Sequence, residues 1–190
     1  MATGITQNEI FGKDYSSINK LNKGEYESCT FKDCDFSQAD LSNFTFIDCR
    51  FELCNLSMAK VRDTGLKTVK FINCKLLGVN FSDCNLFLLS LGFENCLMNL
   101  TSFYKLKLKG TRFKNCDLQE TDFTDSDLPH AIFENCNFER AIFEGTNLEK
   151  ADFRTSFHYS IDPALNRIKK AKFSQNGLAG LLDKYDIVIE

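Results

Sequence analysis

Nine cysteines are the side chains in this 190-residue sequence that are best suited to chemistry. A thiol can bind zinc, form a disulfide or act as a nucleophile. Zinc ligands usually come in close pairs, about two to four residues apart, whereas the closest cysteines here are five residues apart. Even the densest group is therefore a poor zinc site, and we predict neither a metal nor another cofactor. That group is Cys29, Cys34, Cys49 and Cys54.

The other residue types that serve catalysis form no active-site pattern. His130 and His158 are the only histidines, and neither stands beside a patterned nucleophile or carboxylate pair. Glycine-rich phosphate loops and the HExxH and GxSxG motifs are absent from the sequence. We therefore predict that the protein is not an enzyme. An enzyme that uses its thiols is the weaker alternative.

An apolar residue, most often Phe or Leu, recurs at every fifth position, and the residue two before it is usually small. These centres run from Leu21 to Leu86, resume at Phe93 after seven residues, and continue to Phe153. They persist more weakly to Phe173, and His158 falls on one of them. A period of five fits neither a helix nor a strand, so it indicates a repeat architecture.

Residues twenty apart form columns of one type, which predicts that four pentapeptides make one coil. With a step of twenty-two across the irregular interval, one column reads Phe31, Phe51, Phe71, Phe93, Phe113, Phe133, Phe153 and Phe173. The small position of the next column reads Cys34, Cys54, Cys74, Cys96, Cys116 and Cys136, and Cys29, Cys49 and Cys84 also take small positions. We therefore expect every cysteine to be a small core residue. Stacked parallel side chains are also badly oriented for disulfides.

The repeat of a small residue, a polar residue, Leu or Phe and two variable residues resembles the pentapeptide-repeat family over roughly residues 21–173. This resemblance implies an all-β fold, a right-handed quadrilateral β-helix of about eight coils. We expect residues 1–20 to form an N-terminal cap and residues 21–173 to form the β-helix, irregular at 87–92. Residues 174–190 are expected to form a C-terminal helix and strand.

The C-terminal segment is the expected cap and dimer contact. Ser174 can cap a short helix over residues 177–185, and a strand is expected over 186–190. Similarity to the quinolone-resistance and microcin-immunity branch of the family implies a homodimer through this segment; a monomer with a plain cap is the alternative. The residues expected at this contact are Leu178, Leu181, Leu182, Tyr185, Ile187 and Ile189.

Acidic residues dominate residues 117–152, with ten Asp and Glu against Arg140 and Lys150. Stepping by twenty predicts four ion pairs on adjacent coils: Lys105–Asp125, Lys107–Asp127, Lys114–Glu134 and Glu120–Arg140. Six acids are left without a predicted partner, namely Asp117, Asp122, Glu139, Glu144, Glu149 and Asp152. We call these six the acidic set. A stripe of such residues can imitate a DNA phosphate backbone, although a solvated surface explains the charges alone more simply.

The irregular segment offers a second candidate surface. It reads Phe87, Leu88, Leu89, Ser90, Leu91 and Gly92, and the glycine suits a bulge or kink. Its apolar residues Phe87, Leu88, Leu89 and Leu91 either form an exposed partner site or pack over the distorted corner.

The net charge and the targeting signals exclude some classes of partner and location. The formal net charge is −3, so the chain has no basic field for nucleic acid, and it shows neither a signal peptide nor a membrane span. Cysteines without an export signal predict the cytoplasm. The family resemblance implies a bacterial, non-enzymatic DNA mimic that binds DNA gyrase or topoisomerase IV and protects it from quinolones or related toxins. A rigid scaffold with an unrelated protein partner is the alternative; neither hypothesis involves direct binding to nucleic acid or to a membrane.

Overall fold

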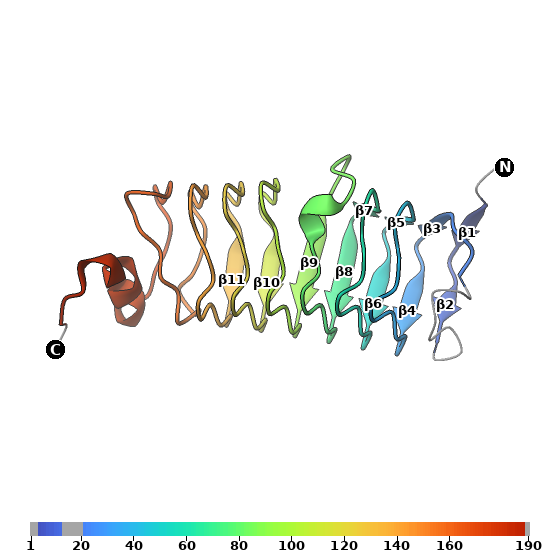
Figure 1. Ribbon diagram of the computed structural model, residues 1–190, viewed down its shortest axis with the longest axis horizontal. Helices are drawn as coiled ribbons and strands as arrows, with labels where there is room; N and C mark the ends of the chain where they lie inside the picture. The colour runs from blue at the N-terminus through green and yellow to red at the C-terminus, as the bar shows by residue number, and fades with distance from the viewer. Residues whose placement is uncertain (1–3, 13–20, 189–190) are drawn as a thin grey trace.

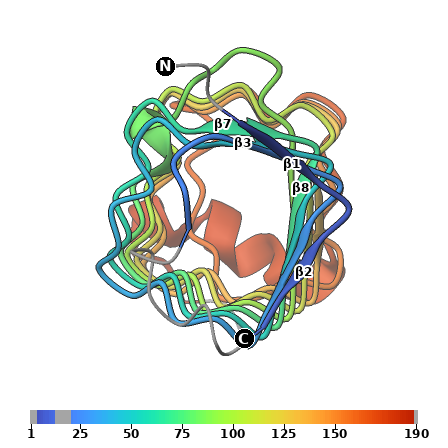
Figure 2. The ribbon, with the colours of Figure 1, turned by 90° about the vertical axis from the view of Figure 1, so that its right-hand side faces the viewer.

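The computed structural model describes residues 4–12 and 21–188. The chain winds into a rod of stacked coils, with a short helical segment closing the C-terminal end (Figure 1). Seen along the rod, each coil is four-sided, and strands β1, β3 and β7 lie on one side while β2 and β8 lie on the adjacent side (Figure 2). The predicted four-sided β-helix is confirmed.

Two parallel sheets run along the rod, and each strand pairs with the equivalent strand of the next coil. The four-stranded sheet contains β1 (Ile5–Gln7), β3 (Glu25–Glu27), β5 (Thr45–Ile47) and β7 (Gly65–Lys67). The seven-stranded sheet contains β2 (Ile10–Phe11), β4 (Thr30–Lys32), β6 (Arg50–Glu52), β8 (Val69–Ile72), β9 (Leu91–Glu94), β10 (Arg112–Lys114) and β11 (Ile132–Glu134). Short helical turns are η3 (Phe81–Asp83), η4 (Gln175–Leu181) and η5 (Asp183–Tyr185).

The register confirms the twenty-residue coil. Phe31 lies opposite Phe51, and Phe51 lies opposite Phe71. The step becomes twenty-two only between Phe71 and Phe93. We number the faces 1 to 4 after the pentapeptides centred on Phe31, Phe36, Leu41 and Phe46.

The core of face 1 is a continuous stack of phenylalanine rings. Consecutive ring centroids lie 4.6 to 5.5 Å apart along the whole column. The stack starts at Phe11, one coil earlier than predicted, and ends at Phe173. Face 3 holds a second stack, Phe81, Phe103, Phe123 and Phe143, whose rings meet those of face 1 edge to face. Because no coil can bury its own centre, this shared core holds adjacent coils together.

Most corners of the coils are turned by one residue with a positive φ. On one corner these residues are Asn73, Asn95, Asn115 and Asn135, with φ between 52° and 54°. Asparagine tolerates this left-handed backbone better than most residues. The same four side chains also form a ladder, in which each amide donates to the carbonyl of the asparagine one coil before it.

Both ends of the chain differ from the expected outline. Residues 5–7 and 10–11, expected in the N-terminal cap, already pair with the coil that contains β3 and β4; residues 13–20 lie outside the described residues. At the C-terminus, the predicted helix consists of the two short segments η4 and η5, because Leu182 interrupts them. The predicted strand over 186–190 is absent from its described part, residues 186–188, and Ile189 lies outside the described residues.

Candidate protein-interaction surfaces

The interior positions that hold the cysteines select for small hydrogen-bond donors. All nine cysteines are free and buried. The Cys49 thiol donates to the Tyr26 carbonyl oxygen one coil earlier, at 3.2 Å. The Thr64 hydroxyl, in the corresponding position of another face, donates to the Leu41 carbonyl oxygen at 2.8 Å. The sequence interpretation recognised the small size of this position but missed its donor role, although Cys, Thr and Ser share it.

Most of the buried thiols are poor nucleophiles, whereas the hydrogen bond with the Cys116 thiol lowers the pKa of Cys136. Burial raises the pKa of Cys49 and of Cys84 to about 11. Contact with the Cys136 thiol, followed by burial, raises the pKa of Cys116 to about 12. Since the thiolate is the reactive form, these groups stay unreactive at neutral pH. The described residues contain no group of three or more His, Cys, Asp or Glu that could hold a metal ion.

The acidic set does not form one stripe. The register separates its members among all four faces: Asp152 on face 1, Asp117 and Glu139 on face 2, Asp122 and Glu144 on face 3, and Glu149 on face 4. Residues close in sequence turn a corner every five positions, so a run of acids in the sequence is spread around the rod.

Two members of the set are paired, contrary to the prediction. Glu149 binds Arg167 with a 3.0 Å N–O distance, because Arg167 stands one coil further along face 4. Asp152 binds the Arg154 guanidinium at 2.8 Å, and Lys172 lies 3.9 Å away. The Arg154 hydrogen bonds lower the pKa of Asp152 below its usual value.

Amide side chains, rather than cations, bind the acids of face 2. Asp117 accepts hydrogen bonds from Asn99 and Asn137, both at 3.2 Å. Glu139 accepts one from Gln119 at 2.8 Å. Neither carboxylate forms a salt bridge within the described part of the chain.

The predicted ion pairs are realised only in part. Glu120–Arg140 is confirmed, with a 2.9 Å N–O distance. Lys114 instead binds Glu94 at 2.8 Å, and Glu134 binds Arg112. Long side chains can reach either neighbouring coil, so column order alone does not choose the partner.

The remaining predicted pairs leave carboxylates on the surface. Lys105 lies 4.6 Å from the centre of the Tyr104 ring and forms no salt bridge with Asp125. Lys107 and Asp127 occupy bridged positions without a salt bridge among the described residues. Face 3 therefore carries Asp122, Asp125 and Glu144 without a salt-bridge partner in the described ranges; we call these three residues the acidic patch.

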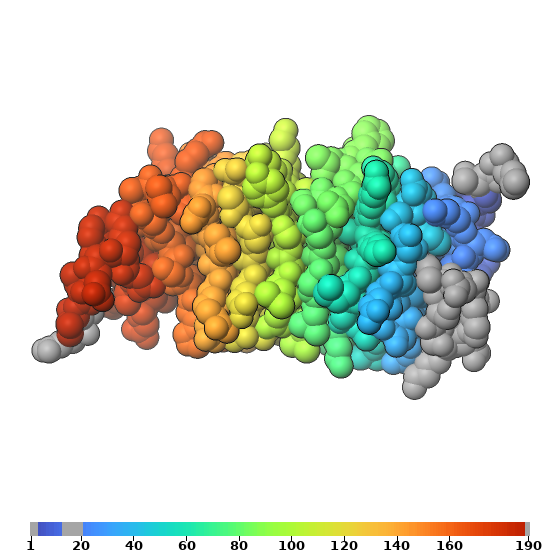
Figure 3. Space-filling model, in the orientation of Figure 1, coloured from blue at the N-terminus to red at the C-terminus, as the bar shows by residue number. Residues whose placement is uncertain are grey.

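The irregular coil both buries and exposes its leucines. Leu86, predicted to be a core centre, is 61% exposed, and Leu89 packs against the core instead. Leu91 is buried in β9 opposite Val69, so it is not available as a partner contact, and Gly92 is part of the same strand. The loop that leads into β9 projects from the rod (Figures 1 and 3). Phe87 and Leu88 in this segment are 67% and 64% exposed. The exposed apolar loop is thus Leu86–Leu88.

The C-terminal segment covers the end of the core and also exposes apolar side chains. Leu181 packs against the core, while Leu178, Leu182, Tyr185 and Ile187 are exposed. The segment is tied to the rod by the Lys184–Asp162 salt bridge at 2.6 Å and by the Ile161 amide, which donates to the Gly180 carbonyl oxygen at 2.8 Å.

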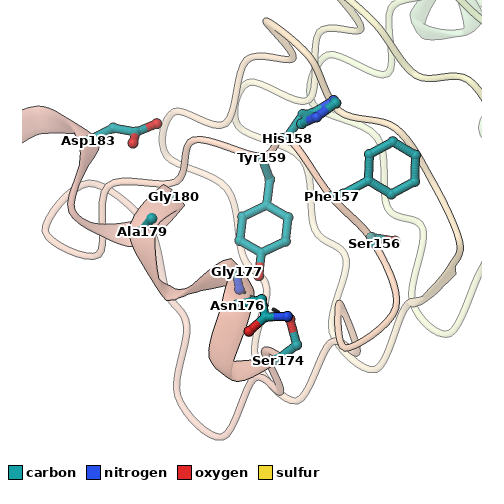
Figure 4. A pocket seen from close by; sticks show the side chains of 10 residues that line it. All are labelled: Ser156, Phe157, His158, Tyr159, Ser174, Asn176, Gly177, Ala179, Gly180 and Asp183. Carbon is teal, nitrogen blue, oxygen red and sulfur yellow. Dashed lines mark hydrogen bonds between the residues drawn. The ribbon is translucent and has the colours of Figure 1, made fainter. Parts of the chain in front are cut away.

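A hollow of about 360 Å³ lies between this segment and the last coil (Figure 4). Tyr159 is buried there, while His158, which falls on a centre of the five-residue period, is exposed with φ of 58°. His158 Nδ1 lies 3.0 Å from Asn137 Oδ1, so a neighbouring coil rather than Asp183 engages this histidine.

Stacked pentapeptide coils around a closed apolar core define a solenoid whose chemistry lies on its outer surface. A family profile described as a pentapeptide repeat region matches residues 24–91 and 88–158. The chain therefore belongs to the pentapeptide-repeat family. A search of curated protein sequences gave no significant match. In the described part of the chain, every helix is too short or too polar to cross a membrane.

The solved structures similar to this chain include QnrB1, described as a plasmid-mediated fluoroquinolone resistance protein. The full-length form is 20% identical, with a TM-score of 0.58 over 97% of this chain and 100% of QnrB1. A trypsin-treated variant of QnrB1 is 20% identical, with a TM-score of 0.51 over 100% of both chains. These likenesses establish the fold.

Proposed function

We propose that this protein is a non-enzymatic, rod-shaped interaction protein that binds DNA gyrase or topoisomerase IV in the cytoplasm and protects it from quinolones or related toxins. The observation that carries the proposal is the end-to-end likeness to QnrB1, a fluoroquinolone resistance protein. Buried thiols with raised pKa and a filled interior favour a binding role over catalysis.

The acidic patch on face 3 is the proposed DNA-like element. Asp122, Asp125 and Glu144 lie on two successive coils, about 4.8 Å apart, with no cation bound within the described residues. Duplex DNA carries about one charge per 1.7 Å of its axis, so the patch imitates a short stretch of phosphates rather than a rod-long duplex. The other acids of the acidic set contribute less, since arginine neutralises Glu149 and Asp152, and Asp117 and Glu139 lie on face 2.

Dimerisation through the C-terminal segment is part of the proposal. The exposed side chains of Leu178, Leu182, Tyr185 and Ile187 would be buried by a second copy of the same segment.

The test is DNA supercoiling by gyrase with the purified protein titrated in, with and without a fluoroquinolone. We expect rescue from the drug, or inhibition of supercoiling at higher protein concentration. Replacing the acidic patch by Asp122→Asn, Asp125→Asn and Glu144→Gln should abolish the effect. The matched control, Glu94→Gln with Glu120→Gln and Glu134→Gln, removes the same number of charges from paired positions and should retain it.

A rigid scaffold for an unrelated protein is the second candidate, and the exposed apolar loop favours it. Phe87 and Leu88 form an apolar projection that a DNA mimic does not need. If gyrase activity is unaffected at every ratio, the topoisomerase proposal fails. Pull-down with the wild type and with Phe87→Ser/Leu88→Ser would then identify a partner that depends on the loop.

A further inference from the structure

Face 2 exposes apolar side chains in the middle of the rod, away from the loop and from the C-terminal segment. Leu97 is 43% exposed, and Leu100 and Met58 are 62% and 61% exposed. Leu97 lies on the face itself, while Leu100 and Met58 lie along the corner between faces 2 and 3. Exposed apolar groups that gather on one face of a folded protein mark a contact surface.

A positive and a negative residue flank the exposed leucine of this face, so the face can pair with an inverted copy of itself. Lys75, Leu97 and Asp117 are successive members of one bridge ladder. Each step is about 4.8 Å, so the ladder reads positive, apolar and negative over three coils. Lys75 has no salt bridge within the described residues, and Asp117 is bound only by neutral donors.

The corner beside this ladder also carries an apolar residue on the coil of Leu97. Gly78, Leu100 and Glu120 follow one another there, and Leu100 stands on the same coil as Leu97. Met58 reaches over Gly78, with its sulfur 2.5 Å from the place a Cβ on that glycine would occupy. Leu100 thus extends the apolar centre of the face to its edge.

The backbone gives a second, independent reason to assign a role to these corner residues. Met58 and Leu100 have φ of 58° and 62°, a left-handed conformation that bulky apolar residues seldom adopt. Asn95, on the adjacent corner of the same coil, has φ of 54° and suits that backbone. The geometry of the corner therefore does not account for leucine or methionine at these positions, whereas a contact surface does.

We propose that face 2 binds face 2 of a second copy of this chain, with the two rods antiparallel and a twofold axis at the coil of Leu97 and Leu100. Leu97 then packs against Leu97 of the partner subunit. Lys75 faces Asp117 of the partner subunit, and Asp117 faces Lys75 of the partner subunit. A parallel pair would set each charge level with its own copy, and like charges at one level repel. This lateral contact is separate from the C-terminal contact in the proposed function.

A residue on a twofold axis meets itself, which gives a direct test. Because all nine native cysteines are buried, Leu97→Cys creates a single exposed thiol. Mild oxidation of the native full-length variant should give a covalent dimer on a non-reducing gel. Ile142→Cys, on face 3 and 45% exposed in the wild type, is the matched control and should give no covalent dimer. Equal crosslinking of both variants, or of neither, overturns the proposal.

Charge exchange tests the antiparallel register. In the Leu182→Asp background, Lys75→Asp and Asp117→Lys should each weaken dimerisation by about tenfold, measured by sedimentation equilibrium, and the double exchange should restore it. Leu100→Asn should also weaken the dimer while the melting temperature of the fold is kept or raised, since asparagine suits the left-handed corner. Failure of the double exchange to restore the dimer contradicts the register.

The same experiments separate this contact from the C-terminal one. Leu182→Asp should leave the crosslinking of Leu97→Cys unchanged, because Leu182 lies in the terminal segment. Loss of crosslinking in this background would assign the association to the C-terminus and refute the lateral contact. Neither result depends on whether the protein affects gyrase.

Discussion

At the scale of single residues, two positions of each pentapeptide point into the rod, and they stabilise it in different ways. The central Phe or Leu supplies apolar area, and the small residue two before it supplies both space and a hydrogen-bond donor. Phe113 is fully buried between Phe93 and Phe133, with ring centroids 5.0 Å away on each side. Thr64 is fully buried as well, and its hydroxyl donates to Leu41.

Phe113→Ala should lower the free energy of unfolding by about 3–5 kcal/mol, because it empties the middle of the ring stack. Urea denaturation followed by circular dichroism measures the change. Ile142→Ala, at a half-exposed outward position, should change stability by about 0.5 kcal/mol or less. Equal losses in the two variants would contradict the assignment of inward and outward positions.

Thr64→Val keeps the shape of the side chain but removes its hydroxyl. We expect a loss of about 1 kcal/mol in the free energy of unfolding, measured in the same way. Thr64→Ser retains the donor and should restore the hydrogen bond. If valine proves as stable as threonine, the small position selects for size alone.

The buried thiols predict how stability depends on pH. In the unfolded chain the thiol of Cys49 titrates near 9.0, whereas its pKa in the fold is about 11. The unfolded state therefore loses its proton first, and the contribution to stability that is present below pH 9.0 is lost as the pH rises to about 11. Urea midpoints at pH 7.5 and pH 10, with ionic strength held constant, should show this decrease. Cys49→Ser should reduce it, and an unchanged pH dependence would argue against a protonated core thiol.

At the scale of elements, the irregular coil departs from the five-residue repeat but keeps its backbone hydrogen bonds to the coil before it. Asn85 donates to the Thr64 carbonyl oxygen at 3.0 Å, and Ser90 donates to the Leu66 carbonyl oxygen at 3.0 Å. The extra residues between these two bonds form the exposed apolar loop, and Lys67 lies 5.5 Å from the centre of the Phe87 ring. Because backbone hydrogen bonds to the preceding coil stand on both sides of the loop, the neighbouring coils keep their register.

Limited digestion with chymotrypsin should cut first in the exposed apolar loop, since Phe87 and Leu88 project from the rod without burial. Mass spectrometry of the first fragments measures the site. Leu86→Ser/Phe87→Ser/Leu88→Ser should remove this cut and leave the urea midpoint unchanged. First cleavage within the regular coils would show that the loop is less accessible than its exposure indicates.

At the scale of the whole molecule, the rod is stabilised by contacts between successive coils, so each coil depends on its two neighbours. We expect hydrogen exchange to be slowest in the coils around Phe113 and to accelerate toward the coils of β1 and of Phe173. Mass spectrometry of peptides from the exchanged native protein would test this gradient. Uniform protection along the rod would indicate cooperative unfolding of the entire solenoid.

The sequence alone determined the coil length, the four faces and the inward columns. Residues twenty apart must share one environment, and a column such as Phe31 to Phe173 is visible without coordinates. It also placed the cysteines in the core, because each one keeps the phase of the repeat. The prediction failed at Leu86, where Leu89 packs against the core instead, and the five-residue period alone does not place Tyr159, which is buried next to the exposed His158. A fixed period cannot show which residue an irregular coil turns inward.

Only the tertiary structure decided how the surface is organised. The acidic set looked like a stripe in the sequence, but the corners distribute it over four faces, and Arg167 and Arg154 neutralise two of its members. Lys75, Leu97 and Asp117 are far apart in the sequence, yet they stand in one ladder. The inward positions follow from the five-residue spacing of small and apolar residues, which can be read along the chain. Outward side chains choose partners among neighbouring coils by their reach and direction, and these depend on the folded rod.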